Sequence, residues 1–154
     1  MVARGRAIKP MGGHPWFEIL HKGVIKTSLE SADKYGAIQE LVDLLVESKD
    51  ITLTQRDPVV EAVFSRERSM GTGMEQGVAI PHGSSDHVQN LFGALGVSRT
   101  GIPFDCLDGS PARLIVLLVL PRNEFNLHVR TLAGISHLLN EKAFREALIS
   151  AENA

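Results

Sequence analysis

Hydrophobic residues recur at helical spacing in the first half of the chain. After Ser31, apolar residues return every three or four positions for about four turns, which predicts a helix with one buried face and Ser31 as its N-cap. Asp57-Pro58 indicates the start of a second helix, because Asp is a good cap and proline fits the first helical position. That helix should end near Gly71, because glycine favours a chain that leaves a helix.

Beyond these helices the hydrophobic residues form short continuous runs. Gly77–Ile80 is such a run, closed by Pro81. Leu91–Val97 and Leu114–Leu120 are two further runs, and the second is continuous enough for a buried central strand. Asp108-Gly109 lies between them and is typical of a tight turn. These patterns predict strands.

Helical spacing returns toward the end of the sequence. One helix is expected from Leu127 to about Leu139, and a second from Glu141 to about Ser150 with Asn140 as its cap. No internal repeat or low-complexity segment is visible, so the chain is expected to form one unit after a loose start. Because helices and strands alternate, the predicted class is α/β.

Composition and charge narrow the kind of protein. With 154 residues, 44% of them hydrophobic and 22% charged, the chain fits one globular domain with one core. A net charge of −2 gives no reason to expect nucleic acid or an anionic membrane as partner. Cys106 is the only cysteine, which excludes an internal disulfide and suits a reducing compartment. No apolar run approaches the about 20 residues of a membrane helix, and Met1–Pro15 lacks the apolar core of a signal peptide. The cytoplasm is therefore the expected location.

The candidate chemistry comes from the histidines, of which His82 is the first. It follows the run Gly77–Pro81, where a buried strand is expected to end and a Gly/Ser turn, Gly83-Ser84-Ser85, to begin. Ligand sites of α/β sheets favour such strand ends, and a neutral imidazole can act as a nucleophile near neutral pH. The competing interpretation is an ordinary histidine of a surface loop.

His128 stands on the apolar stripe of the predicted helix that begins at Leu127. It is either a core histidine satisfied by a backbone carbonyl or a functional residue facing inward at a helix end that favours anions. His137 falls on the opposite side of that helix and should face solvent. The remaining histidines, His87, His14 and His21, lie in loop or terminal contexts and are expected to be spectators.

Arg66 is the remaining candidate, in the last turn of the second predicted helix. It is either a cation that favours the helix C-terminus or a phosphate clamp, since the planar guanidinium suits phosphate oxygens. Spacing alone does not distinguish Arg66 from Arg68.

Three segments resemble the mannitol–fructose class of phosphotransferase system enzyme IIA, which includes the nitrogen-regulatory IIA paralogue. Ser65–Gly83, with Arg-Glu-Arg followed by Gly-x-Ala-Ile-Pro-His, is similar to the phosphorylation-site segment of that family. Gly101–Pro111 resembles its hairpin, and His128–Leu139 resembles the helix that begins with its second active-site histidine. The match runs in order from about Trp16 to Ile149. The resemblance implies a single α/β domain with a mixed sheet flanked by helices.

The resemblance also implies a role for each candidate residue. His82 would be phosphorylated by a phosphohistidine on the small histidine phosphocarrier protein. His128 would orient the phosphoryl group, and Arg66 would stabilise its charge. A IIB protein or domain, or regulatory target proteins, would be the further partners. No metal or organic cofactor is implied.

Two segments depart from the family pattern. Residues 1–15 have no counterpart and are expected to be flexible, ahead of an enzyme IIA-like domain at residues 16–154. The sequence stops at Ala154, where the family usually continues into one more short helix.

Three functions follow from these observations. The first is a sugar-system carrier that passes phosphate from His82 to a cysteine of IIB. The second is a regulatory protein of the nitrogen branch, which binds other proteins according to its phosphorylation state. The third is a metal-dependent hydrolase using His82, Asp86, His87 and His128, although their spacing matches no strong zinc motif.

Overall fold

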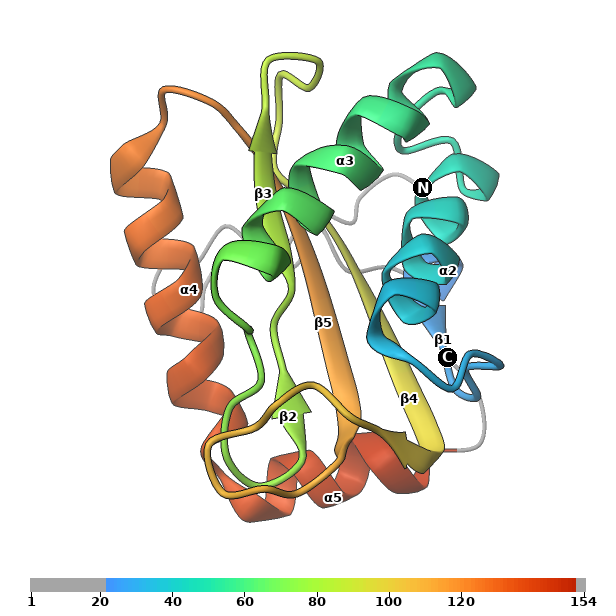
Figure 1. The fold of residues 1–154 in the computed structure, drawn as a ribbon, viewed down its shortest axis with the longest axis vertical. Helices are drawn as coiled ribbons and strands as arrows, with labels where there is room; N and C mark the ends of the chain where they lie inside the picture. Colours follow the sequence, from blue (N-terminus) through green and yellow to red (C-terminus); the bar gives the residue numbers. More distant parts are fainter. Residues whose placement is uncertain (1–21, 152–154) are drawn as a thin grey trace.

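The computed structural model describes residues 22–151, which form a mixed sheet enclosed by helices (Figure 1). One sheet contains all the described strands in the order β1-β4-β5-β2, and β3 pairs with β5 on the same side as β2. Strands β4 and β5 are antiparallel, whereas the other pairs are parallel. The α/β class and the mixed sheet are confirmed. In chain order the elements are η3 (Lys22–Val24), β1 (Ile25–Lys26), α2 (Lys34–Glu47), α3 (Leu53–Ser69), β2 (Val78–Ala79), β3 (His82–Ser85), β4 (Phe92–Ile102), β5 (Ala112–Pro121), α4 (Phe125–Leu139) and α5 (Lys142–Ser150).

Strand β5 is the buried central strand that its apolar run predicts. Alternate side chains point to opposite faces of a strand, so β5 contributes to two separate hydrophobic clusters. Ile115, Leu117 and Val119 pack with α2 and α3. The alternate residues of β5, which include Val116, Leu118 and Leu120, pack with Ile135 and other residues of α4 and α5. The sheet therefore carries helices on both faces, as expected.

The structure corrects the predicted start of both early helices. Asp33, rather than Ser31, caps α2, and its carboxylate accepts a hydrogen bond from the Gly36 N–H at 2.7 Å. The Ser31 hydroxyl instead donates to Glu40, at 3.0 Å. Asp and Ser are comparable N-caps. Asp33 is the cap because it directly precedes the first helical residue, Lys34, and lies within reach of the Gly36 N–H.

Helix α3 begins at Leu53, well before the predicted start at Asp57-Pro58. Thr52 and Gln55 form a capping box, in which the backbone N–H of Thr52 donates to the Gln55 side chain at 2.7 Å. Pro58 thus lies inside the helix and removes one backbone hydrogen bond. Burial of Val59, Val60 and Val63 stabilises this turn despite the missing bond.

The second half of the chain follows the predicted order with small shifts. Helix α4 starts at Phe125, and Asn140 is its C-cap, while Glu141 holds the N-cap position of α5. The tight turn at Asp108-Gly109 is confirmed by the positive φ of Gly109, 78°. Hydrogen bonds from the Ser110 hydroxyl and the Gln76 N–H lower the pKa of Asp108 to about 2.

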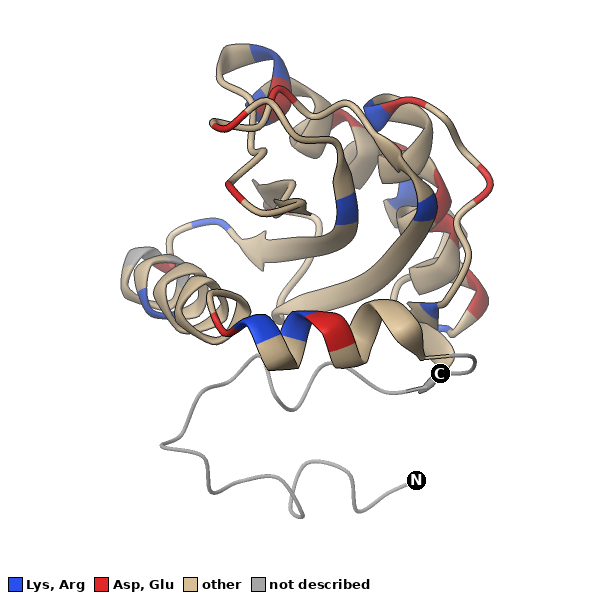
Figure 2. Cartoon of the chain, turned by 90° about the horizontal axis from the view of Figure 1, so that it is seen from below, with Lys and Arg blue, Asp and Glu red and all other residues tan. Residues whose placement is uncertain are grey.

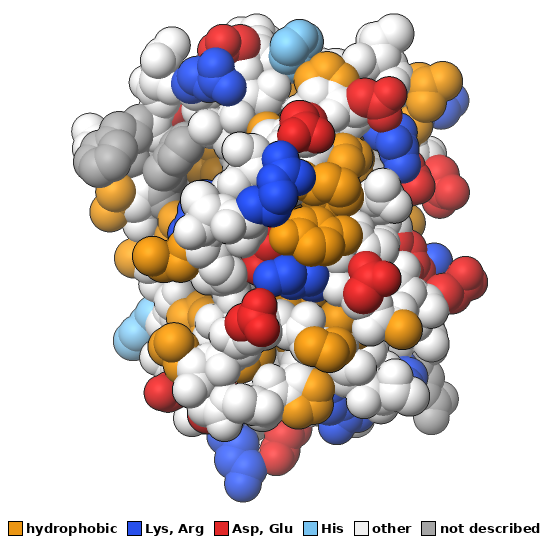
Figure 3. Space-filling view, in the orientation of Figure 1, with side chains coloured by type: hydrophobic (Ala, Val, Ile, Leu, Met, Phe, Trp, Pro, Cys, Tyr) orange, Lys and Arg blue, Asp and Glu red, His pale blue; other side chains and the backbone are white. Residues whose placement is uncertain are grey.

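Charged residues lie mainly on the helices and loops around the sheet (Figure 2). On the face seen in Figure 3, positive and negative side chains alternate with hydrophobic ones, and neither sign forms a continuous area. Within residues 22–151, no helix has the length and apolarity needed to cross a membrane.

Candidate functional site

A cavity of about 700 Å³ lies where α3 meets strand β3 at the edge of the sheet. One wall is the side of α3 from Pro58 to Ser69, and the other is formed by β3 and the residues that follow it. The ionisable side chains that line it are Glu61, Arg66, His82, His87 and Arg122. His82 and Arg66, two of the three residues predicted for the site, thus share one cavity.

The structure places His82 at the start of a strand instead of at a strand end. Residues His82–Ser85, predicted to open into a Gly/Ser turn, form β3 and pair in parallel with Leu118–Pro121 of β5. His82 pairs with Leu118, and paired residues of neighbouring strands share a face. The half-buried His82 side chain is therefore on the same side of the sheet as Leu118. It can line the cavity beside α3 because, among the described strands, β3 pairs only with β5 and lies at the edge of the sheet.

The small residues of β3 explain why a segment with turn composition forms a strand. A Cβ atom at Gly83 would lie only 2.9 Å from the carbonyl carbon of Ala62 and the nitrogen of Val63. Glycine thus allows the α3 backbone to lie directly against β3. This close contact brings the last turns of α3 to the cavity.

One hydrogen bond fixes the protonation pattern of the His82 ring. The Nδ1 atom lies 2.9 Å from the backbone carbonyl oxygen of Ile80. A carbonyl oxygen can only accept, so Nδ1 must carry the hydrogen. In the neutral ring the lone pair then belongs to Nε2.

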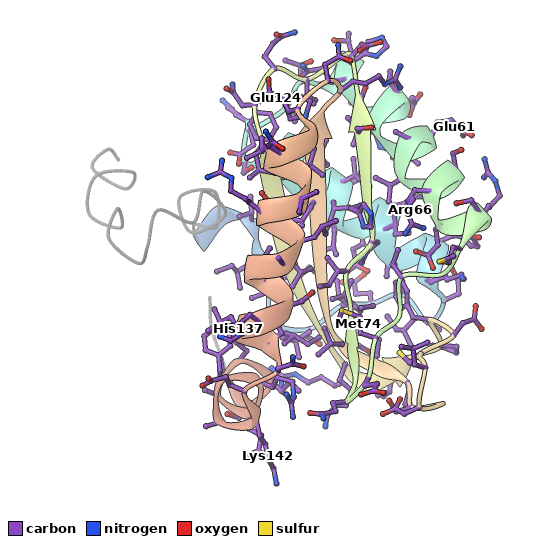
Figure 4. All side chains as sticks on the ribbon, turned by 90° about the vertical axis from the view of Figure 1, so that its left-hand side faces the viewer. Glu61, Arg66, Met74, Glu124, His137 and Lys142 are labelled. Atoms are coloured by element: carbon purple, nitrogen blue, oxygen red, sulfur yellow. The ribbon has the colours of Figure 1, made fainter. Side chains whose placement is uncertain are left out.

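Arg66 and Arg68, which spacing could not distinguish, have different environments. Arg66 lines the cavity, and its guanidinium donates to the carbonyl oxygen of Met70 at 2.6 Å. Figure 4 shows its side chain between α3 and the edge of the sheet. Arg68 is exposed and forms an ion pair with Glu61 at 2.9 Å. Among the described residues no carboxylate forms an ion pair with Arg66, so its charge is available to an anion in the cavity.

The cavity wall also contains two residues that were not predicted for the phosphoryl-carrier site. His87 was predicted to be a spectator in the phosphoryl carrier and a metal ligand in the hydrolase; it lines the cavity, and its backbone N–H donates to the Ser85 hydroxyl at 3.0 Å. Arg122 lines it as well and forms an ion pair with Asp86 at 3.0 Å. The β3–β5 register places Ser85 opposite Pro121, so the residues after both strands meet. The sequence predicted a turn at Ser85, so it gave no sign that the residues after β3 and β5 lie side by side.

The other histidines have mixed outcomes. His128 lies in the first turn of α4, as predicted for the backbone, but its side chain is outside the described part of the structure. Its inward orientation stays a prediction. His137 is exposed near the other end of α4, which confirms the helical phase (Figure 4). His14 and His21 lie outside the described residues.

The described residues do not assemble the ligand set of the hydrolase hypothesis, and the side chain of its fourth ligand, His128, is outside them. Asp86, one of its proposed ligands, forms an ion pair with Arg122. Over the described part of the chain, no three His, Cys, Asp or Glu side chains gather in a way that could hold a metal ion.

Residues 18–154 match the family model described as phosphoenolpyruvate-dependent sugar phosphotransferase system, EIIA 2. The chain belongs to this family.

Named relatives fall into a sugar-specific and a regulatory group. The fructose-specific EIIABC component of Bacillus subtilis is 35% identical over 88% of this chain, which spans only 21% of that protein. The fructose-specific EIIA component of Haloferax volcanii is 34% identical, over 79% of this chain and 78% of its own length. A nitrogen regulatory protein of Bradyrhizobium diazoefficiens is 29% identical, over 91% of this chain and 90% of its own.

Solved structures share the fold. The nitrogen regulatory protein IIA-Ntr of Neisseria meningitidis aligns with a TM-score of 0.79 and 32% identity, over 88% of this chain and 91% of that one. The mannitol IIA of Escherichia coli, solved in complex with phosphorylated mannitol IIB, aligns with a TM-score of 0.74 and 20% identity, over 88% of this chain and 91% of that one.

Proposed function

We propose that this protein is a phosphoryl carrier in which the Nε2 atom of His82 accepts and releases the phosphoryl group. The observation that carries the proposal is the hydrogen bond between His82 Nδ1 and the Ile80 carbonyl oxygen, 2.9 Å. It keeps the lone pair of the neutral ring on Nε2, and the ring lines the same cavity as Arg66.

The proposed transfer needs little covalent chemistry from the protein. The Nε2 lone pair attacks phosphorus of a phosphohistidine on the small histidine phosphocarrier protein. The phosphorus–nitrogen bond of the donor breaks, and its electron pair returns to the donor ring. His82 keeps the Nδ1 hydrogen, so its ring gains positive charge, which the Ile80 carbonyl stabilises. Such transfers depend mainly on positioning and charge stabilisation.

Arg66 and His128 are proposed to stabilise the transferred group. By analogy with other phosphorylated side chains, the group brings about −1.5 to −2 charges into the cavity. The positive charge of the Arg66 guanidinium matches this negative charge, because the guanidinium donates to the neutral carbonyl of Met70 and pairs with no carboxylate among the described residues. His128, in the first turn of α4, is proposed to hydrogen-bond the phosphoryl oxygens.

A sugar-specific role is the first candidate for the next step. In it, His82 passes the group to a cysteine of a IIB protein or domain in the cytoplasm. The fructose-specific relatives support this role, as does the complex of the structurally similar mannitol IIA with phosphorylated IIB.

A regulatory role is the second candidate, and the nitrogen regulatory relatives favour it. The output would then be phosphorylation-dependent binding to other proteins. A IIB/IIC permease pair encoded beside the gene, and transfer of label to that IIB, would favour the sugar role over the regulatory one.

Phosphate uptake tests the proposal directly. The protein is incubated with labelled phosphoenolpyruvate, enzyme I and the histidine phosphocarrier protein, and acid-labile label is measured. We expect uptake by the wild type and none by His82→Ala. Label that persists in His82→Ala would overturn the assignment, and His137→Gln, an exposed histidine, is the matched control.

A further inference from the structure

Glu67 is a buried carboxylate directly beside Arg66 that does not line the cavity. Its side chain has no exposed surface, and carboxylates are rarely buried unless they are paired and hydrogen-bonded. Its position in the last turn of α3 points it toward the loop that follows the helix. This loop leads from α3 to the strands that carry His82.

Three donors satisfy the Glu67 carboxylate. The backbone N–H of Thr72 donates at 3.1 Å, and the Thr72 hydroxyl donates at 2.5 Å. The ammonium group of Lys34 lies 3.2 Å from the carboxylate and also pairs with Asp105 at 3.1 Å. The carboxylate thus anchors the loop to α3, and Lys34 balances its charge.

Thr72 connects this anchor to the His82 ring. The carbonyl oxygen of Thr72 accepts a hydrogen bond from the backbone N–H of Ile80 at 3.1 Å. The carbonyl oxygen of Ile80 in turn accepts the Nδ1 hydrogen of His82 at 2.9 Å. A continuous series of contacts therefore runs from Glu67 through Thr72 and Ile80 to His82.

The same loop carries the acceptor of Arg66. Met70, at the start of the loop, accepts the guanidinium hydrogen bond at 2.6 Å. Holding Thr72 against Glu67 constrains the short segment between the end of α3 and Thr72. The positions of the Arg66 guanidinium and the His82 ring thus both depend on the loop that Glu67 anchors.

We propose that Glu67 is a positioning residue, which acts through Thr72 and Ile80 to fix the His82 ring with its lone pair on Nε2. The role in transfer rests on the proposed function, whereas the role in holding the ring does not. The carboxylate suits the task because it accepts all three donors at once. An amide in its place has only one acceptor oxygen and presents N–H groups to a donor.

Glu67→Gln tests the proposal in the unphosphorylated full-length protein. Nitrogen-15 NMR of the neutral His82 ring distinguishes hydrogen on Nδ1 from hydrogen on Nε2. We expect the wild type to show Nδ1–H alone and Glu67→Gln to show a measurable fraction of Nε2–H. This readout requires no phosphoryl donor, so it remains decisive if the proposed function fails.

Glu40→Gln is the matched control. Glu40 accepts from the backbone N–H and hydroxyl of Ser31 and pairs with Lys26 at 2.7 Å, so its donor set resembles that of Glu67. It lies in α2 and does not line the cavity. Glu40→Gln should lower stability without changing the His82 ring.

Phosphate uptake provides the second readout. We expect Glu67→Gln to lower the maximal uptake rate roughly 10- to 100-fold, because small displacements of reacting groups have effects of this size. The donor concentration at half-maximal rate should change less than about twofold, since Glu67 does not line the cavity.

Thr72 variants keep the proposal testable if Glu67→Gln does not fold. Thr72→Val removes the hydroxyl without changing the side-chain shape and should produce the same ring change, while Thr72→Ser should restore the wild-type signal. An unchanged ring in both Glu67→Gln and Thr72→Val would overturn the proposal. Slower uptake with an unchanged ring would overturn it too, because Glu67 would then act by another route.

Discussion

At the scale of single residues, the cavity separates two arginines of the same helical turn. Arg66 lines it and donates to a backbone carbonyl, whereas Arg68 is not in its wall and pairs with the exposed carboxylate of Glu61, which is in the wall. An exposed ion pair contributes little to stability. Among residues 22–151 no carboxylate pairs with Arg66, so its guanidinium is available to an anion and the two residues should differ in function.

Replacing Arg66 should therefore slow phosphate uptake. A charge-assisted hydrogen bond is worth about 1.5–3 kcal/mol, so we expect Arg66→Ala to lose roughly 10- to 150-fold in single-turnover rate. Arg66→Lys keeps the charge without the planar fork and should fall between Arg66→Ala and the wild type. Arg68→Ala, the matched control, should stay within about threefold. Equal rates for both alanine variants would contradict the assignment.

His128 gives a second prediction at this scale. If its ring donates a hydrogen bond to the phosphoryl oxygens, His128→Gln keeps a donor and should slow uptake less than His128→Ala. The same single-turnover measurement compares the two variants. Wild-type rates in both would reduce His128 to a structural residue of α4.

At the scale of elements, the contact between α3 and β3 determines the site. His82 and Arg66 belong to different elements, and both line one cavity because these elements touch at Gly83. The contact is close enough that it excludes even a methyl group.

Gly83→Ala should consequently destabilise the protein and slow uptake together. The added Cβ would meet the α3 backbone at 2.9 Å, so the helix must move away from the strand. Overpacking of this kind costs about 1–3 kcal/mol in the free energy of unfolding, which urea titration measures. Gly71→Ala is the control, because its Cβ would find ordinary contacts of 3.5 Å. Equal unfolding free energies for the two variants would contradict the prediction, because α3 would then accommodate the added methyl group at no cost.

At the scale of the whole molecule, a partly buried ion pair connects β1 to α2. Burial alone would raise the pKa of Glu40, but the hydrogen bond from Lys26 and those from Glu30 and Ser31 outweigh it, so the pKa falls below 4.5. A carboxyl whose pKa is lowered by folding stabilises the protein above its unfolded pKa. This contribution disappears as the pH falls through the lower, folded value.

The stability of the protein should accordingly decrease below about pH 4.5. Urea titrations between about pH 6 and pH 3 should show a smaller loss of unfolding free energy for Glu40→Gln than for the wild type, because the variant lacks this titrating group. Glu124→Gln replaces an exposed carboxyl and should follow the wild-type curve. Parallel curves for Glu40→Gln and the wild type would contradict the prediction.

The sequence by itself determined those features that depend on neighbours along the chain. Helical and strand periodicity predicted the α/β class, the central strand at Leu114–Leu120 and the exposed side of α4 at His137. The local motif around His82 and its resemblance to enzyme IIA indicated the family, which the comparisons confirmed. These predictions were confirmed because the spacing of apolar residues within one helix or strand does not depend on which elements pack against it.

Only the tertiary structure decided which elements meet and in which register. Pairing with β5 makes a strand of His82–Ser85, although its composition is typical of a turn. The cavity beside the contact at Gly83 is lined by Arg66 and not by Arg68, and the strand register brings His87 and Arg122 to it. Such contacts join residues far apart in the chain, so they follow from packing and strand pairing that no local pattern records.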